Sequence, residues 1–247
     1  MKINIIIICF TSICLSNNAN LLMDEGNELM INEKYENAIK IYESILNLEY
    51  ESAQLYFNLG NAYFRRGQIG NAIWSYVNAQ SIEPRNDDVK YNLEIANASI
   101  IDRIEMPRLF VLVQIYKTIR DNFTMLEWLS LGSIFLLLHS IYYFMKKMWL
   151  SKVFRNGFIS LLLLLGMVFS HLFALEHYLI GKRNRNAIVI SNAVDAYSGP
   201  FFGKNKILFQ VNEGSMAEIS KIQKNWFEIV LIDGKKGWVE DKHLRLF

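Results

Sequence analysis

Apolar and polar residues follow three different patterns along the chain. Residues 20–105 place apolar side chains at helical spacing, whereas residues 128–145 and 158–175 hold no charged side chain. Residues 187–247 alternate β-branched or aromatic residues with polar ones, which is typical of strands. We therefore predict a multidomain membrane protein with all-α helical repeats, two transmembrane helices and a C-terminal all-β barrel.

An internal repeat of 34 residues runs through the first segment. Shifting the sequence by 34 residues superimposes three pairs: Gly26 on Gly60, Ala38 on Ala72 and Tyr42 on Tyr76. Such a period indicates stacked helix–turn–helix units. The glycine and alanine would let two helices approach closely while the tyrosine fills the gap between units. We expect these repeats over residues 20–105, with a capping helix at residues 88–100.

The second unit carries the signature of a known repeat. Its signature residues are Tyr56, Leu59, Gly60, Tyr63, Ala72, Tyr76, Ala79 and Pro84. This pattern resembles the tetratricopeptide repeat (TPR), whose stacks bind proteins in a concave groove lined by the first helix of each unit. The resemblance implies a protein-binding groove lined by Met23, Asn27, Met30, Phe57, Asn58, Asn61, Phe64 and Arg65.

The chemistry of that groove also follows from the resemblance. Asn27 and Asn58 match two asparagines of the subset of repeats that grips a peptide carboxylate, but Met23, Asp88 and Asn92 replace its basic residues. We therefore expect an apolar, amide-lined groove that suits a helix or an extended segment better than an acidic tail. Several of the apolar residues could instead belong to the core, and the sequence leaves both interpretations open.

The two uncharged runs predict transmembrane helices at residues 125–145 and 157–179. Each run of 18 residues spans about 27 Å as a helix, close to the thickness of the hydrocarbon core. The loop between them, residues 146–156, carries four basic residues and no acidic one, so we expect it in the cytoplasm. Before the first span, residues 106–124 predict an amphipathic connector, either a helix at the membrane interface or a packed linker.

Residues 1–19 predict a signal peptide, cleaved or retained as an anchor. Cys9 and Cys14 both lie inside it, so the remaining chain would have no disulfide or thiolate metal site. Export of the amino-terminal segment and a cytoplasmic basic loop place both soluble segments on the periplasmic side of a bacterial inner membrane.

The carboxy-terminal segment, residues 186–247, predicts five strands. We expect them at residues 187–196, 207–211, 216–223, 226–231 and 236–239, with a tight hairpin at Asp233-Gly234. The spacing of Glu213-Gly214, Trp226 and Gly237-Trp238 resembles the bacterial SH3 domain, a module that binds cell-wall peptides or proteins. Trp226 and Trp238 are either core anchors or a ligand platform, and the core interpretation is favoured.

Charge and histidine placement restrict the function classes. A net charge of +2 without a basic face does not suit a nucleic-acid binder. His139 and His171 lie in the apolar runs at different depths, which favours interhelical hydrogen bonds over a shared metal or haem. His177 and His243 are isolated in sequence. We predict no catalytic residue, no metal and no cofactor, and therefore a non-enzymatic protein.

The order of segments resembles the BatE-like, repeat-containing proteins of the bacterial aerotolerance (Bat) operon family. The most specific residues are those of the runs 56–63 and 70–73 and the Gly237-Trp238 pair. The resemblance implies a scaffold in an inner-membrane complex with von Willebrand A-type partner proteins, linked to stress tolerance. A peptidoglycan-binding cell-wall sensor or anchor is the alternative interpretation.

Overall fold

The computed structural model describes residues 18–100, 110–148, 157–183, 185–201, 203 and 206–247. These residues form two compact units, one made of Met1–Pro107 with Arg185–Phe247 and the other of Arg108–Asn184. The predicted signal peptide lies almost wholly outside the described residues, and so do Lys152 and Arg155 of the predicted basic loop.

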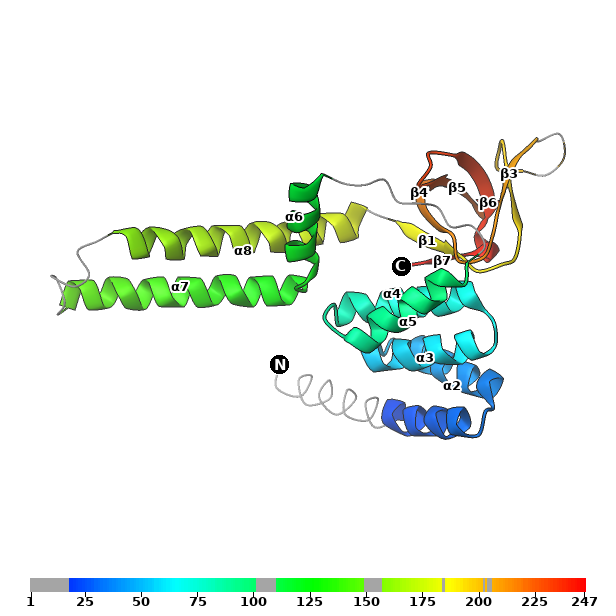
Figure 1. The fold of residues 1–247 in the computed structure, drawn as a ribbon, viewed down its shortest axis with the longest axis horizontal. Helices are drawn as coiled ribbons and strands as arrows, with labels where there is room; N and C mark the ends of the chain where they lie inside the picture. Colours follow the sequence, from blue (N-terminus) through cyan, green and yellow to red (C-terminus); the bar gives the residue numbers. More distant parts are fainter. Residues whose placement is uncertain (1–17, 101–109, 149–156, 184, 202, 204–205) are drawn as a thin grey trace, which may run out of the picture. The chain divides into compact units, whose positions relative to one another are not determined.

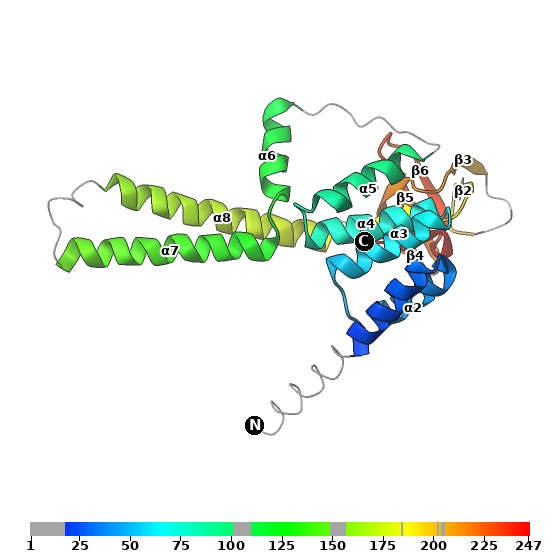
Figure 2. The same ribbon diagram turned by 60° about the horizontal axis from the view of Figure 1, so that its bottom comes forward.

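Helices form the amino-terminal half of the first unit. Residues 18–31 are helical and are followed by α2 (Tyr35–Asn47), α3 (Ala53–Arg65), α4 (Ile69–Ile82) and α5 (Asp87–Ala98), each packed on the next (Figures 1 and 2). Ser52 caps α3 by accepting a hydrogen bond from the backbone N–H of Leu55. The predicted helical repeats are confirmed, and the expected capping helix is α5.

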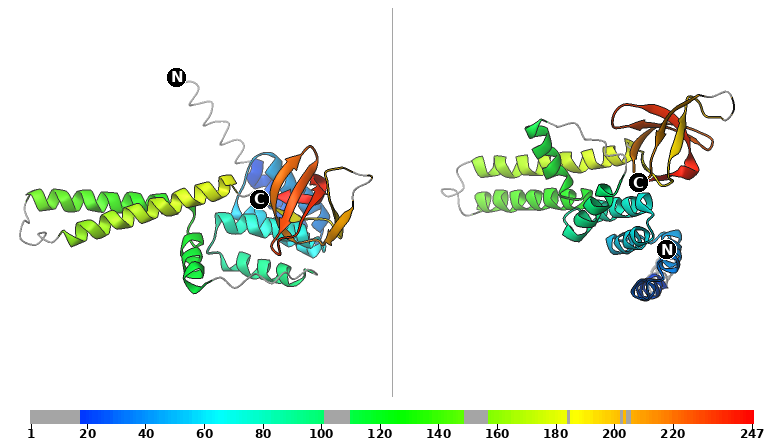
Figure 3. Two further views of the ribbon diagram at one scale, coloured as in Figure 1. Left: turned by 90° about the horizontal axis from the view of Figure 1, so that it is seen from above. Right: turned by 45° about the vertical axis from the view of Figure 1, so that its right-hand side comes forward.

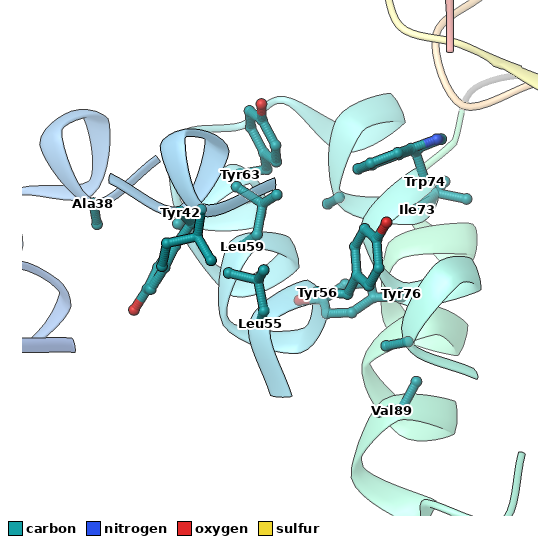
Figure 4. Close-up of a cluster of buried hydrophobic side chains, with 14 of the residues drawn as sticks. Ala38, Tyr42, Leu55, Tyr56, Leu59, Tyr63, Ile73, Trp74, Tyr76 and Val89 are labelled. Atoms are coloured by element: carbon teal, nitrogen blue, oxygen red, sulfur yellow. The ribbon is translucent and has the colours of Figure 1, made fainter. Parts of the chain in front are cut away.

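The repeated glycine and tyrosine meet as the sequence predicts. Tyr42 and Tyr76 are fully buried in a core that they share with Leu55, Leu59 and Val89 (Figure 4). A Cβ atom on Gly60 would lie 2.6 Å from a ring carbon of Tyr76, so only glycine leaves room for that ring. The equivalent distance from Gly26 to Tyr42 is 2.4 Å.

Residues 186–246 form one antiparallel sheet. Its strands are β1 (Asn186–Val189), β2 (Val194–Tyr197), β3 (Ile207–Val211), β4 (Met216–Gln223), β5 (Trp226–Leu231), β6 (Lys236–Glu240) and β7 (Leu244–Leu246), with a 3₁₀ turn, η1 (Asp241–His243), before β7. They are ordered β3-β2-β6-β5-β4-β1-β7. Alternate side chains from all seven strands share one core, so the sheet curls around it (Figure 1).

Two details of the strand prediction are wrong. The single strand expected at residues 187–196 is split into β1 and β2, because the chain turns at Ala193, which has a φ of 50°. Strand β7 was not predicted, and it pairs with β1 through Ala187, Ile188 and Val189. The Asp233-Gly234 hairpin is present, with the N–H of Gly234 donating to the carbonyl of Leu231.

The sheet and the helical repeats share a boundary inside the first unit. Ala187 and Val189 point into the sheet core, whereas Ile188 between them is completely buried in the core of the helical repeats. Phe247 packs against the same helical core. Strand β1 therefore belongs to two hydrophobic cores at once, and α4 is the helix that contacts it.

The second unit holds α6 (Val111–Asp121), α7 (Met125–Met148) and α8 (Phe158–Arg183). Helices α7 and α8 lie side by side (Figures 1 and 3). Both are long and apolar enough to cross a membrane by length and composition, and most of their large apolar side chains are exposed. They begin where the sequence predicted and extend a few residues beyond the predicted ends.

The two histidines of these helices bond differently. His139 Nδ1 lies 3.4 Å from the hydroxyl of Ser160, which is an interhelical contact of the kind predicted. His171 Nδ1 instead contacts the carbonyl of Met167 on its own helix, at 2.9 Å. Its ring occupies the space beside Gly132 of α7, where a Cβ atom would lie only 2.5 Å from the imidazole.

Candidate protein-binding groove

A hollow of about 420 Å³ crosses the first helices of three successive units. Its lining residues are Met30, Asn61, Phe64, Arg65, Tyr76, Asn92 and Ile95. Four of the eight predicted groove residues lie here. A second hollow of about 310 Å³ contains two more, Met23 and Asn27, and is completed by Asn20, Asp24, Tyr50, Ser52 and Gln54. We call the larger hollow the groove.

Burial separates the core residues from the groove residues. Met23 is 9% exposed and belongs to the helical core. Met30, Phe57 and Phe64 are half-buried and pack against that core from the edge, so each presents part of its surface to solvent. Phe57 does not line either hollow, and its ring lies 6.1 Å from that of Tyr76. Met23 thus belongs to the core, and the other three lie at its edge; protein binding by these residues stays a prediction.

The asparagines form a hydrogen-bond pattern that repeats with the 34-residue period. Asn27 Oδ1 accepts two bonds of 2.8 Å, from the hydroxyl of Tyr42 and from Asn58 Nδ2. One unit later, Asn61 Oδ1 accepts from the hydroxyl of Tyr76 at 2.8 Å and from Asn92 Nδ2 at 2.9 Å. Each asparagine therefore ties its own unit to the first helix of the next.

These bonds determine which atoms remain for a ligand. Burial raises the pKa of the Tyr42 hydroxyl to about 12, an effect that a hydrogen bond with Asn58 partly offsets, so the hydroxyl stays a neutral donor. The Oδ1 atoms of Asn27 and Asn61 already accept two hydrogen bonds each, so only their Nδ2 groups remain as donors for a ligand. Among the described residues, neither Nδ2 group has an acceptor.

Arg65 adds a charge to this set of donors. Its side chain is exposed at the groove, and none of the carboxylates in the described part of the chain forms an ion pair with it. The apolar walls from Met30, Phe64 and Ile95 lie next to this guanidinium. The groove can therefore hold an apolar side chain while offering donors to a carbonyl or carboxylate oxygen.

A second polar cluster joins the helical repeats to the sheet. Arg245 of β7 forms an ion pair of 2.7 Å with Glu43 of α2, and its guanidinium also donates to the hydroxyl of Tyr63 and to Asn71 Oδ1. The guanidinium carbon lies 3.5 Å from the centre of the Trp74 ring. Sequence reasoning missed the contact between these five residues, although it named Tyr63 as a signature residue of the repeat. We call them the Arg245 cluster.

The start of α4 is capped by the sheet. Gln68 precedes the helix without a side-chain cap, and Glu213 Oε1 instead accepts a 2.8 Å bond from the N–H of Gly70. A Cβ atom on Gly70 would lie 2.3 Å from the carbonyl oxygen of Val189, so the helix and β1 are in direct contact. Trp74 Nε1 donates to the carbonyl of Leu246 at 2.6 Å.

The two predicted tryptophans lie on the outer face of the sheet. In β5 the side chains of Phe227, Ile229 and Leu231 point into the core, so Trp226 points the other way. It is largely covered and meets Tyr197 edge-on at 5.7 Å. Trp238 pairs in register with Tyr197 on the neighbouring strand and is partly exposed. Trp226 is therefore buried, as the favoured core interpretation expects, although it lies outside the main sheet core, whereas Trp238 is partly exposed. Ligand binding by these rings stays a prediction.

Ionisable groups elsewhere do not gather into a metal centre. Within the described ranges, no group of three or more His, Cys, Asp or Glu side chains is arranged to hold a metal ion. His177 Nε2 lies 3.0 Å from the carbonyl of Arg120, and His243 Nδ1 lies 2.9 Å from the hydroxyl of Ser191. Both histidines thus have hydrogen-bond partners.

Comparison with known proteins gives matches to the helical repeats. The TPR repeat family matches residues 26–67. Rattus norvegicus sperm-associated antigen 1 is 29% identical over 79 residues, which is 32% of this chain and 9% of that protein. The chain thus matches about a tenth of that relative's length. The crystal structure of the Sgt2 TPR domain from Aspergillus fumigatus matches 33% of this chain and 54% of its own, at 25% identity and a TM-score of 0.32. The chain contains tetratricopeptide repeats in its amino-terminal segment.

Proposed function

We propose that this chain is a non-catalytic, membrane-anchored scaffold that binds protein partners in its TPR groove. The observation that carries the proposal is the groove itself, where Arg65 and the amides of Asn61 and Asn92 lie beside apolar walls. TPR repeats have a general role in protein–protein interaction, and this combination of donors and apolar surface suits a peptide segment with an acidic or carbonyl group next to an apolar side chain.

The two apolar helices support the membrane anchor. Their exposed faces carry large apolar side chains, including Leu137, Leu164 and Phe169, that water solvates poorly. The contact between Glu43 and Arg245 supports the same arrangement, because segments on either side of the two helices meet in one unit. Such a contact requires an even number of membrane crossings between them, and α7 and α8 provide two.

Charge supports a particular side of the membrane. Lys146 and Lys147 end α7, and Lys152 and Arg155 follow them in sequence, which supports a cytoplasmic loop. We therefore propose that both soluble segments lie on the periplasmic side of a bacterial inner membrane. A reporter active only outside the cytoplasm, fused after Phe247, is expected to be active. Activity of a cytosolic reporter alone at that position would contradict this orientation.

The resemblance to the BatE-like proteins of the Bat family supports a particular set of partners. We propose von Willebrand A-type membrane proteins of a stress-tolerance complex as the ligands of the groove. The order of TPR repeats, apolar helices and β segment supports this assignment, as do the residues of the run 56–63.

Photocrosslinking from the groove tests the scaffold function. The full chain in native membranes would carry a photoreactive amino acid at Arg65, inside the groove, or at Lys40, an exposed position on α2. We expect discrete adducts with von Willebrand A-type proteins from position 65 and none from position 40. Identical adducts from both positions, or no adduct at all, would count against binding in the groove.

A peptidoglycan-binding module is the second candidate function. Its support is the partly exposed ring of Trp238, which pairs in register with Tyr197 on the neighbouring strand, because sugar rings and peptides stack on exposed aromatic faces. Retention of the full chain on purified peptidoglycan that is lost in Trp238→Ala but kept in Phe201→Ala, another exposed aromatic of the same segment, would support it. No retention of the unmodified chain would exclude it.

A further inference from the structure

Helix α6 has an apolar face that the described residues of its own unit leave exposed. At 100° per residue, five apolar side chains of α6 fall on one side of the helix: Val111, Leu112, Ile115, Tyr116 and Ile119. They are between 43% and 66% exposed. Gln114, Lys117, Thr118 and Asp121 lie on the opposite side, so α6 is amphipathic without a packed core to explain it.

Polar contacts hold α6 at one end of the helix pair. Arg120 forms an ion pair of 2.8 Å with Glu176 near the end of α8, and the hydroxyl of Tyr116 donates to the same carboxylate. The carbonyl of Arg120 accepts a 3.0 Å bond from Trp128 Nε1 at the start of α7 and lies 3.0 Å from His177 Nε2. Helix α6 consequently runs across the end of α7 and α8 rather than along them (Figure 3).

Aromatic rings mark this end of the pair. Phe173 lies 5.5 Å from Tyr116 and 4.6 Å from Trp128, and Phe123 lies 5.0 Å from Trp128. Tryptophan and tyrosine concentrate where the hydrocarbon core of a membrane meets the headgroups. The contact between Tyr116 and Phe173 therefore joins the apolar face of α6 to α8.

We propose that α6 lies in the interfacial layer of the lipid bilayer, with its apolar face against the acyl chains and Lys117 among the headgroups. This inference rests on the membrane anchoring proposed above. It assigns Glu176 a positioning role, because its carboxylate fixes α6 at a depth set by the end of α8. The occupant of the apolar face is lipid, and a protein partner is the competing outcome of the test.

Depth-dependent fluorescence quenching in lipid vesicles tests the inference. The full chain, with Cys9 and Cys14 replaced by serine, would carry one labelled cysteine on the apolar face of α6 (Ile115), on its polar face (Gln114) or inside the uncharged run of α8 (Leu164). We expect lipids spin-labelled near the headgroup to quench position 115 about two-fold more than position 114. Aqueous iodide should show the reverse order, and only lipids labelled deep in the acyl chain should quench position 164 strongly.

The outcomes separate the inference from the anchor. Equal quenching by iodide at positions 114 and 115 would contradict the interfacial placement of α6. If deep spin labels still quench position 164, the proposed membrane anchoring by α7 and α8 would stand. Protection of position 115 from both iodide and lipid quenchers means that protein covers the face, which also overturns the interfacial placement. Quenching of position 164 by iodide would contradict the proposed membrane anchoring itself.

A substitution of the positioning residue provides a second test. Glu176→Gln removes the charge that pairs with Arg120, so lipid quenching at position 115 is expected to fall by about half while position 164 is unchanged. Asp121→Asn is the matched control, because it removes only the pair between neighbouring Asp121 and Arg120. Unchanged quenching in Glu176→Gln would remove the positioning role.

Discussion

Arg245 holds its guanidinium carbon 3.5 Å from the centre of the Trp74 ring while the same group pairs with Glu43. One side chain thus contacts α2 and α4 from a strand that lies 202 residues after Glu43. Cation–π attraction and charged hydrogen bonds act together here, at a site where both ionic partners are about three-quarters buried. The helical repeats are therefore supported by the sheet.

Arg245→Met should destabilise the full chain in detergent by about 2 kcal/mol, because methionine keeps contact with Trp74 but loses the charged hydrogen bonds. Glu43→Gln should have a similar effect, and the double variant should be less destabilised than the sum of the two. Denaturant unfolding followed by tryptophan fluorescence measures this. Lys40→Met, which removes the exposed pair with Glu36, should change the free energy of unfolding by less than about 0.5 kcal/mol.

The carboxyl of Glu213 predicts a pH dependence of stability. Burial raises its pKa, and the hydrogen bond from Gly70 N–H offsets this only in part. The folded state therefore binds the proton more tightly than the unfolded chain, so the free energy of unfolding falls as pH rises from the ordinary glutamate range through the raised pKa. In Glu213→Gln, which keeps an oxygen acceptor for Gly70, this part of the pH dependence should disappear.

Chemical unfolding of both proteins between pH 4 and pH 8 measures the effect. The variant should be at least as stable as the unmodified chain near neutral pH, by up to about 1 kcal/mol, with the difference shrinking at the acid end. Glu94→Gln, on an exposed site of α5, controls for the loss of one charge. A difference that grows as pH falls would show that the carboxylate form stabilises the fold.

Replacing one of the repeated asparagines should show how much its hydrogen bonds contribute to stability. Asn61→Ala leaves the hydroxyl of Tyr76, a residue only 1% exposed, without its acceptor, which should cost about 1–3 kcal/mol. Adding Tyr76→Phe should recover part of the loss, because the orphaned hydroxyl is removed. Thermal unfolding of the full chain followed by circular dichroism reports both. Asn32→Ala removes a solvent-exposed bond to Glu28 and should be close to neutral.

The contact between Gly60 and Tyr76 predicts a strict size limit. Gly60→Ala would place a methyl group 2.6 Å from the tyrosine ring, so we expect destabilisation of about 1–3 kcal/mol despite the better helix propensity of alanine. Gly181→Ala in α8 meets nothing within 4 Å, so it should be neutral or slightly stabilising through the same helix propensity. Equal melting temperatures for Gly60→Ala and the unmodified chain would contradict the packing.

The sequence predicts those features whose partners recur at fixed spacing. The same glycine–tyrosine contact occurs in both repeats. Gly26 and Tyr42 therefore recur in the sequence as Gly60 and Tyr76, 34 residues later. The long apolar helices are equally evident, since length and composition suffice to find them. Four of the eight predicted groove residues line the larger hollow, because the first helices of successive units face it. Protein binding there stays a prediction.

Contacts between distant residues could not be predicted from the local sequence. Glu213 caps Gly70 across 143 residues, yet a glutamate in a loop and a glycine at a helix start are both ordinary at such positions. The turn at Ala193 has a positive φ, and alanine, unlike glycine, does not indicate such a conformation in the sequence. The asparagines were read as ligand-binding groups, and only the structure reveals that their oxygens are used between units.

Strands β1 and β7 follow both long apolar helices in the sequence, so the ribosome synthesises them after those helices. The TPR segment, although made first, receives Ile188, Arg245 and Phe247 only when synthesis has passed residue 247 and both intervening helices have been made. Under the membrane anchoring proposed above, folding of this segment is thereby coupled to membrane insertion. A polypeptide released early from the ribosome would expose Trp74 and Ile73 to chaperones and proteases, so incomplete copies would be removed before they could occupy a partner.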